Sequence, residues 1–143
     1  MKMATYGKGM RKGAGAYARI GVENDVLAAD PHALIAMLFD AAESAIRSAK
    51  AHIIAGNIPA KGEAISRAID IVNQGLLAAL DRERGGEVAE NLSQIYDYVI
   101  RQLRQANLKN DIETLENVET VLGNIGSAWR ELGSSEQVLR NAG

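Results

Sequence analysis

The two histidines are the residues of this 143-residue chain whose chemistry is easiest to judge from their neighbours. Histidine can carry a phosphoryl group or a proton near neutral pH, but only with suitable groups around it. His52 lies four residues before Gly56, and histidine-phosphotransfer domains, which are also four-helix bundles, likewise place a glycine near their phosphorylated histidine. Such a site also needs an exposed mid-helix histidine and a nearby lysine, whereas the stretch 52–56 ends a helix without an adjacent base. A structural role is therefore favoured for His52, and phosphotransfer through it in a signalling bundle stays the alternative function. His32, beside Pro31, is expected to face solvent or cap a helix.

Other catalytic and metal-binding patterns are missing from the sequence. The chain has no cysteine, which excludes disulfides and every thiolate-based metal or redox site. Di-iron bundles need Glu-x-x-His pairs on facing helices, and no such pair occurs. A glycine-rich phosphate loop, a serine nucleophile elbow and a zinc-protease motif are absent as well. We therefore expect no enzyme activity, no catalytic or metal site, no cofactor and no small-molecule substrate.

The charge of the chain is unevenly distributed. The net charge is −2, but residues 1–22 contain five basic and no acidic residues, which leaves 11 basic and 18 acidic residues for the rest. The same segment contains five glycines, which make it costly to order. We expect a flexible, basic, glycine-rich arm over residues 1–22 and a helical bundle domain over residues 23–143. Five spread charges are sparse for a nucleic-acid or membrane contact, so a spacer or an autoinhibitory arm is favoured.

Membrane insertion and export through a secretory signal are not expected. The longest apolar run, residues 33–39, has seven residues, far short of the ~20 needed to cross a bilayer. The basic N-terminus lacks the apolar core of a secretory signal peptide. The protein is therefore expected to stay in the cytosol.

Helix signals divide the chain into four long segments. Asp30-Pro31 is typical of an N-cap followed by the first helical residue, and Gly56-Asn57 can end that helix. A second helix is expected from Pro59 to about Arg84, where Gly85-Gly86 breaks it. The stripe of the third helix has intervals of three and four residues. It comprises Val88, Leu92, Ile95, Val99, Leu103 and Ala106.

The fourth helix is expected to start near Asn110 or Asp111 and to stop at Gly133, and a short fifth helix could follow over residues 135–140. No stretch alternates with the period of two that strands require. Short connections between long helices force neighbours to run antiparallel. The sequence therefore predicts an all-α fold, an antiparallel up-and-down four-helix bundle.

The first and third helices carry more apolar residues than one core stripe needs. The additional residues are Leu34, Met37, Phe39, Tyr96, Tyr98 and Ile100. Two interpretations stay open at this point: a wide core with tyrosine hydroxyls at its rim, or an exposed groove for an amphipathic helix of a partner. In the arm, Tyr17 and Ile20 form an apolar pair that could fill such a groove.

The arrangement of these segments resembles one family, the flagellar export chaperone FliS, over about residues 17–132. The matching residues are Tyr17, Asp30-Pro31-His32, 37–42, 85–92, 95–99, Arg101, 103–107, Asn110-Asp111 and Trp129. The sequence departs from the family pattern in its glycine-rich, basic first sixteen residues. It also has Phe39 where a tyrosine is frequent and Ala41 where a glycine is frequent.

The resemblance implies a function in flagellar export. FliS-like proteins are cytoplasmic helical bundles that hold the C-terminal segment of flagellin, which is disordered in the monomer, and prevent premature polymerisation. The resemblance also implies docking of the loaded chaperone on the export gate protein FlhA and coverage of the client groove by the N-terminal segment. The partner-binding residues expected on this basis are Tyr17, Ile20, Leu34, Met37, Phe39, Tyr96, Tyr98 and Ile100.

Overall fold

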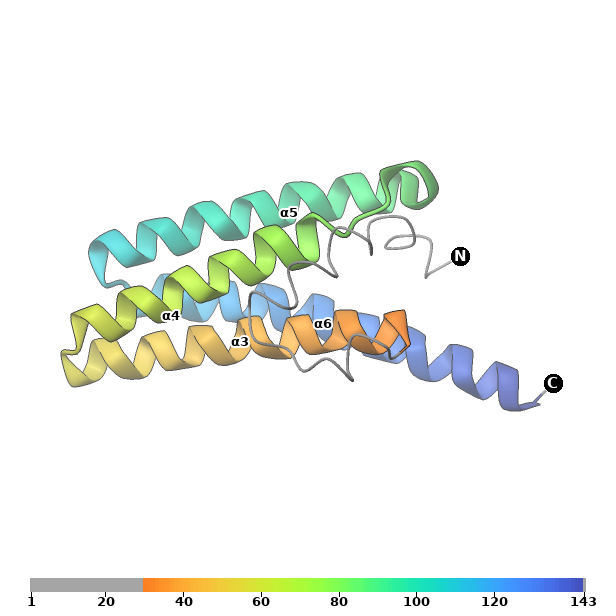
Figure 1. Cartoon of the computed structure of the whole chain (residues 1–143), viewed down its shortest axis with the longest axis horizontal. Helices are drawn as coiled ribbons and strands as arrows, with labels where there is room; N and C mark the ends of the chain where they lie inside the picture. Colours follow the sequence, from red (N-terminus) through yellow and green to blue (C-terminus); the bar gives the residue numbers. More distant parts are fainter. Residues whose placement is uncertain (1–29, 143) are drawn as a thin grey trace.

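The computed structural model describes the backbone of residues 30–142 and the side chains of residues 30–133. Every regular element in this part of the chain is a helix, which confirms the all-α class. The elements are α3 (Pro31–Ala55), α4 (Ile58–Asp70), the π-helix η2 (Ile71–Leu77), α5 (Arg82–Lys109) and α6 (Ile112–Ala142). The helices lie side by side in Figure 1, and the sequence colours run in opposite directions along successive helices. The arm predicted over residues 1–22 lies outside the described residues.

Helix α3 begins and ends at the predicted residues. The Asp30 carboxylate accepts a hydrogen bond from the His32 backbone N–H at 3.0 Å, and Pro31 occupies the first helical position, where no N–H is needed. Gly56 adopts a left-handed φ of 74°, which a glycine tolerates without strain. Its N–H donates to the Ile53 carbonyl and that of Asn57 donates to the His52 carbonyl, so two carbonyls of the last turn of α3 are satisfied.

The second predicted helix starts as expected near Pro59, at Ile58, where the Asn57 side chain caps it. It changes at Ile71 from α-helical to π-helical hydrogen bonding and ends at Leu77, which corrects the predicted end near Arg84. Gly75 within η2 faces α3 so closely that an added Cβ would lie 3.0 Å from a methyl carbon of Leu38. The absence of a side chain at this position therefore lets α3 and η2 approach.

The break predicted at Gly85-Gly86 is confirmed as a kink at Gly86, although helical backbone already begins at Arg82. Helix α5 begins at Arg82, and the side chain of the buried N-cap Asp81 accepts from the Arg84 N–H at 3.1 Å. Gly86 has a φ of 52° and a ψ of −128°, a conformation that side chains rarely adopt. The helical backbone is therefore interrupted at Gly86, which separates a short helical turn starting at Arg82 from the long helix that follows.

Helix α6 continues past the residue where the sequence predicted its end. It runs without interruption to Ala142, so the stop at Gly133 is wrong, and residues 135–140 belong to α6 instead of forming a separate fifth helix. The glycine has a packing role, because the imidazole of His32 lies over it and a Cβ at this position would overlap the ring. His32 is accordingly half-buried, which corrects the solvent-facing position expected for it.

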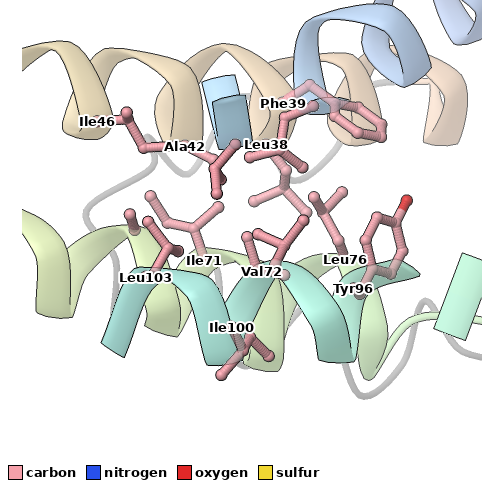
Figure 2. Packing of buried hydrophobic residues seen from close by; sticks show 14 of the residues in the cluster. Leu38, Phe39, Ala42, Ile46, Ile71, Val72, Leu76, Tyr96, Ile100 and Leu103 are labelled. Atoms are coloured by element: carbon pink, nitrogen blue, oxygen red, sulfur yellow. The ribbon is translucent and has the colours of Figure 1, made fainter. Parts of the chain in front are cut away.

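A single apolar core fills the space between the helices, with contributions from α3, α4, η2, α5 and α6. Figure 2 shows its central part, where side chains of α3 point toward those of η2 and α5. Lys61 of α4 is buried at the edge of this core. Its ammonium donates to the backbone carbonyl and the side-chain oxygen of Asn107 at 2.8 and 2.7 Å. Because these acceptors belong to the last turn of α5, the cation also complements the negative end of that helix.

Charged residues connect α3 to α6 along the seam between the two helices. Arg130 pairs with Asp40 and lies 3.8 Å from Glu43, while Lys50 contacts Glu119 at 2.7 Å. One carboxylate oxygen of Glu43 is buried without a hydrogen-bond partner among the described residues. Burial raises the pKa of Glu43 above its usual value; the nearby positive charge of Arg130 opposes this change.

Candidate partner-binding surface

Four of the residues predicted to line an exposed groove lie in the core. Leu34, Phe39, Tyr96 and Ile100 are buried, so the expectation that they face solvent is wrong. Figure 2 shows Phe39 and Tyr96 extending from facing helices into the same interior space. Their ring centroids are 6.5 Å apart with a tilt of 52°, an arrangement that aromatic pairs favour. These residues therefore fill the wide core that was the alternative interpretation.

In the first half of α5 the core stripe is shifted by one residue, whereas Val99, Leu103 and Ala106 in the second half are buried as predicted. The sequence placed Val88, Leu92 and Ile95 at the centre of the core, whereas the structure buries the positions that follow each of them. These buried residues are Ala89, Ser93 and Tyr96. Both sets have helical spacing, and the second set brings the larger Tyr96 side chain inside. The sequence was right that α5 carries two apolar faces, but it exchanged the inner and outer positions in the first half of the helix.

The outer apolar face continues from α5 onto α6. Val88 is 58% exposed, and Leu92 and Ile95 are half-buried at the edge of the core. Val121 and Ile125 of α6 are half-buried in the same way. We call these five residues the α5–α6 strip. The sequence showed two overlapping apolar stripes on α5 with helical spacing, but their periodicity alone does not tell which of them faces inward.

Two predicted contact residues, Met37 and Tyr98, are accessible. Met37 on α3 is 39% exposed and Tyr98 on α5 is 43% exposed. Tyr98 follows Ile95 by three positions, so it extends the α5–α6 strip by one helical turn. Its hydroxyl accepts a hydrogen bond from the Gln102 amide at 3.2 Å. Tyr17 and Ile20 lie outside the described residues.

A second surface feature is an open groove between α3 and α4. It has a volume of about 520 Å³, and its lining comprises small residues of both helices together with His52, Glu63 and Arg67. His52 is half-buried there, in the last turn of α3. Small side chains such as Ala41, Ser44 and Ala64 leave the groove without large apolar contacts. The α5–α6 strip therefore offers the larger apolar contact surface of the two.

Comparison with known proteins decides between the functions still open. The family described as flagellar protein FliS matches residues 13–136, which is most of the chain. The chain belongs to the FliS family. The resemblance inferred from the sequence is thereby confirmed.

Individual relatives of this FliS-family chain are similar over nearly their whole length. A flagellar secretion chaperone FliS from Salmonella typhimurium is 52% identical over 120 residues, which cover 84% of this chain and 89% of the relative. The protein of the same name from Escherichia coli is 43% identical over 130 residues, 91% of this chain and 96% of the relative. The Bacillus subtilis protein of that name is 33% identical over 119 residues, with coverages of 83% and 87%.

Membership in the FliS family assigns the chain to the flagellar secretion chaperones and not to the enzymes. Phosphotransfer through His52 is therefore not pursued. Among the residues that the structure describes, no three His, Asp or Glu side chains are placed to hold a metal ion. No helix within that same part of the chain combines the length and apolar character needed to cross a bilayer.

Proposed function

We propose that this chain is an export chaperone for flagellin that binds the disordered C-terminal segment of its client and prevents premature polymerisation. In this proposal the complex forms in the cytosol and is delivered to the export gate protein FlhA. An antiparallel up-and-down bundle provides the rigid surface. The observation that carries the proposal is the apolar face that α5 leaves uncovered, with Val88 58% exposed in a member of a secretion chaperone family.

The physics of binding an unfolded guest supports this assignment. A disordered segment loses conformational freedom when it binds, so the complex needs an extended apolar contact to offset that loss. From Val88 to Tyr98 the accessible apolar side chains follow α5 for ten residues, roughly 15 Å at 1.5 Å per residue. Val121 and Ile125 widen the contact onto α6. An elongated surface of this kind suits a helical or extended segment better than a compact ligand.

The predicted contact residues take different roles in this proposal. Met37 and Tyr98 contact the client directly, because their side chains are accessible. The four buried residues, Leu34, Phe39, Tyr96 and Ile100, hold α3 and α5 at the separation that shapes the surface. Tyr17 and Ile20 cover part of the surface while no client is bound, so the arm of residues 1–22 is autoinhibitory.

Titration calorimetry with a synthetic peptide of the flagellin C-terminal segment tests client binding. We expect micromolar or tighter affinity and a negative heat-capacity change, which marks the burial of apolar surface. The same peptide with its apolar residues replaced by serine is the matched control and should give no heat. Absence of binding by the unmodified peptide at micromolar concentrations would contradict the proposed function.

Delivery to the export gate is tested separately. The purified chaperone, alone and with bound flagellin, is passed over an immobilised cytoplasmic domain of FlhA. Retention of the loaded chaperone that exceeds retention of the free chaperone is the expected result. Equal retention of both, or of neither, would remove FlhA from the proposal and leave client binding unaffected. Fractionation of the native cell, with the chaperone expected in the cytosolic fraction, tests the location.

A further inference from the structure

We infer that the α5–α6 strip and the uncharged amide side chains along its borders form the surface that holds the client, and that the segment held there presents no charge toward the strip. This inference rests on the proposed function. It adds the role of the border side chains and the chemistry that the client segment must have.

The strip is continuous because of the way α5 and α6 are joined. Only Asn110 and Asp111 separate the two helices, which are in contact with each other. Two helices that reverse direction at residues 110 and 111 bring position 95 opposite position 125, since each is about fifteen residues from the turn. Ile95 and Ile125 are both half-buried and packed against the core. The half-buried residues of α5 and α6 therefore form one continuous strip and not two separate patches.

The borders of the α5–α6 strip carry amide side chains where most protein surfaces carry charged ones. Each border amide lies three or four positions along its helix from a strip residue, from Tyr98 or from another border amide. These residues are Asn91, Gln94, Gln102, Gln105, Asn117 and Asn124. All are exposed except Gln102, which is half-buried beside Tyr98.

Charged residues are correspondingly absent from the middle of the α5–α6 strip. Between Glu90 and Arg104 the only charged residues of α5 are Asp97 and Arg101. At 100° per residue Asp97 lies about 160° around the helix from Ile95 and points away from the strip. Arg101 follows Tyr98 by three positions, so it marks the end of the uncharged stretch on α5. On α6 no charged residue occurs between Glu119 and Arg130. The opposite edge of α6 differs sharply, because ion pairs with α3 fill it.

The chemistry of the borders defines the occupant. A charged side chain of the client that contacts the α5–α6 strip would lose hydration without meeting an opposite charge, which is unfavourable. Amide side chains offer both donors and acceptors, so they can pair with backbone groups of a segment that is not fully helical. The lack of charge on the strip and its borders therefore favours a polypeptide segment with apolar residues on one face and no charges beside them.

Two groups of variants test the location. Val88→Gln combined with Tyr98→Gln removes accessible apolar side chains from the strip, and we expect at least a tenfold weaker Kd for the flagellin peptide. Leu108→Gln, at a side chain that is 82% exposed near the end of α5, is the matched control and should change Kd less than twofold. Far-ultraviolet circular dichroism and thermal unfolding of each variant verify that the fold is intact.

Charge insertion tests the chemistry. Asn91→Asp combined with Gln102→Glu keeps side-chain size nearly constant and places two charges at the border; we expect at least fivefold weaker binding. Asp97→Asn, a change of the same kind on the far side of α5, should have no effect. For the unmodified chain, Kd should change less than threefold between 50 and 500 mM NaCl, because salt screens only charged contacts.

The outcomes separate the inference from the proposed function. Loss of affinity in the strip and border variants, with both controls unchanged, supports the inference. Normal binding by the strip variant overturns it while client binding stands. Normal binding by the border variant, or a strong salt dependence, overturns the neutral chemistry. If the unmodified chain does not bind the peptide, the proposed function fails and the inference fails with it.

Discussion

His32 and Trp129, which are 97 positions apart in the sequence, hold the first turn of α3 against α6. The indole N–H of Trp129 donates to the His32 carbonyl at 2.9 Å, and His32 Nε2 donates to the Trp129 carbonyl. Their rings are stacked, with centroids 4.4 Å apart and planes inclined by 8°. Gly133 provides the space for the imidazole.

The first prediction concerns that space. Gly133→Ala should lower the free energy of unfolding by about 1–3 kcal/mol, because the new methyl group displaces the His32 ring from Trp129. Gly123→Ala is the control on the same helix, since its Cβ would lie 3.6 Å from Glu43, an ordinary contact. The control should be neutral or stabilising by up to about 1 kcal/mol through helix propensity. Urea unfolding measures both variants, and equal stabilities would contradict the packing role of Gly133.

A second prediction separates the core from the surface on α5. Tyr96→Ala should destabilise the fold by about 3–5 kcal/mol, the usual loss when a buried aromatic is truncated. Tyr98→Ala, two positions further on and 43% exposed, should change stability by less than about 0.5 kcal/mol. It should nevertheless weaken binding of the flagellin peptide. Chemical denaturation and calorimetry give the two readouts, and a large stability loss in Tyr98→Ala would place that side chain inside the core.

The third prediction concerns the buried cation of Lys61. Asn107→Ala removes one of the two acceptors of the ammonium and should cost about 1–3 kcal/mol, because a buried donor is left partly unsatisfied. In a Lys61→Met background the same substitution should cost much less, since the donor is gone. A double-mutant cycle by urea unfolding measures this coupling, and additive effects would show that the two side chains do not depend on each other.

The raised pKa of Glu43 gives a prediction about pH. The folded state binds the proton of this carboxyl more tightly than the unfolded state, whose ordinary value is 4.5. Glu43 therefore contributes less stability as pH rises from about 4.5 through the higher pKa of the folded state. Glu43→Gln removes this loss, so its stability relative to the unmodified chain should increase over that interval. Melting temperatures measured between pH 4 and 7 provide the comparison, and parallel profiles would exclude the effect.

A fifth prediction addresses the arm. Deletion of residues 1–22 should strengthen binding of the flagellin peptide severalfold, because the arm competes with the client for the same surface. Tyr17→Ser combined with Ile20→Ser in the full chain should reproduce most of this gain if the apolar pair is responsible. Calorimetry with identical peptide preparations makes the comparison. An unchanged affinity would exclude autoinhibition, and a weaker affinity would instead indicate direct contact between arm and client.

The sequence predicted elements whose ends depend on local chemistry. The Asp30-Pro31 start and Gly56 end of α3 follow from backbone capping, which neighbouring residues determine. Gly133 could not be assigned this way, because its neighbour His32 is remote in sequence. The same limit applies to α5. Two stripes one position apart have equal periodicity. Only packing against Phe39 and the rest of the core determines that Tyr96 faces inward.

The site was accordingly predicted in part. The excess apolar surface on α5 was recognised, and the exposure of Met37 and Tyr98 agrees with the proposed contacts. The exposure of Val88 was missed because this residue had been assigned to the core stripe of the third helix. The π-helical turn at Ile71 was missed as well, since nothing local in the sequence marks the change in hydrogen bonding.

The ion pairs between α3 and α6 also determine how the two helices are aligned. Along α3 the acidic residues Asp40 and Glu43 precede the basic residues Arg47 and Lys50, and each pair faces opposite charges on α6. A slip of α3 by one turn would bring Arg47 to Arg130 in one direction and Glu43 to Glu119 in the other. Repulsion thus penalises both misaligned states, so a chaperone that releases one cargo molecule after another would return to the same geometry each time.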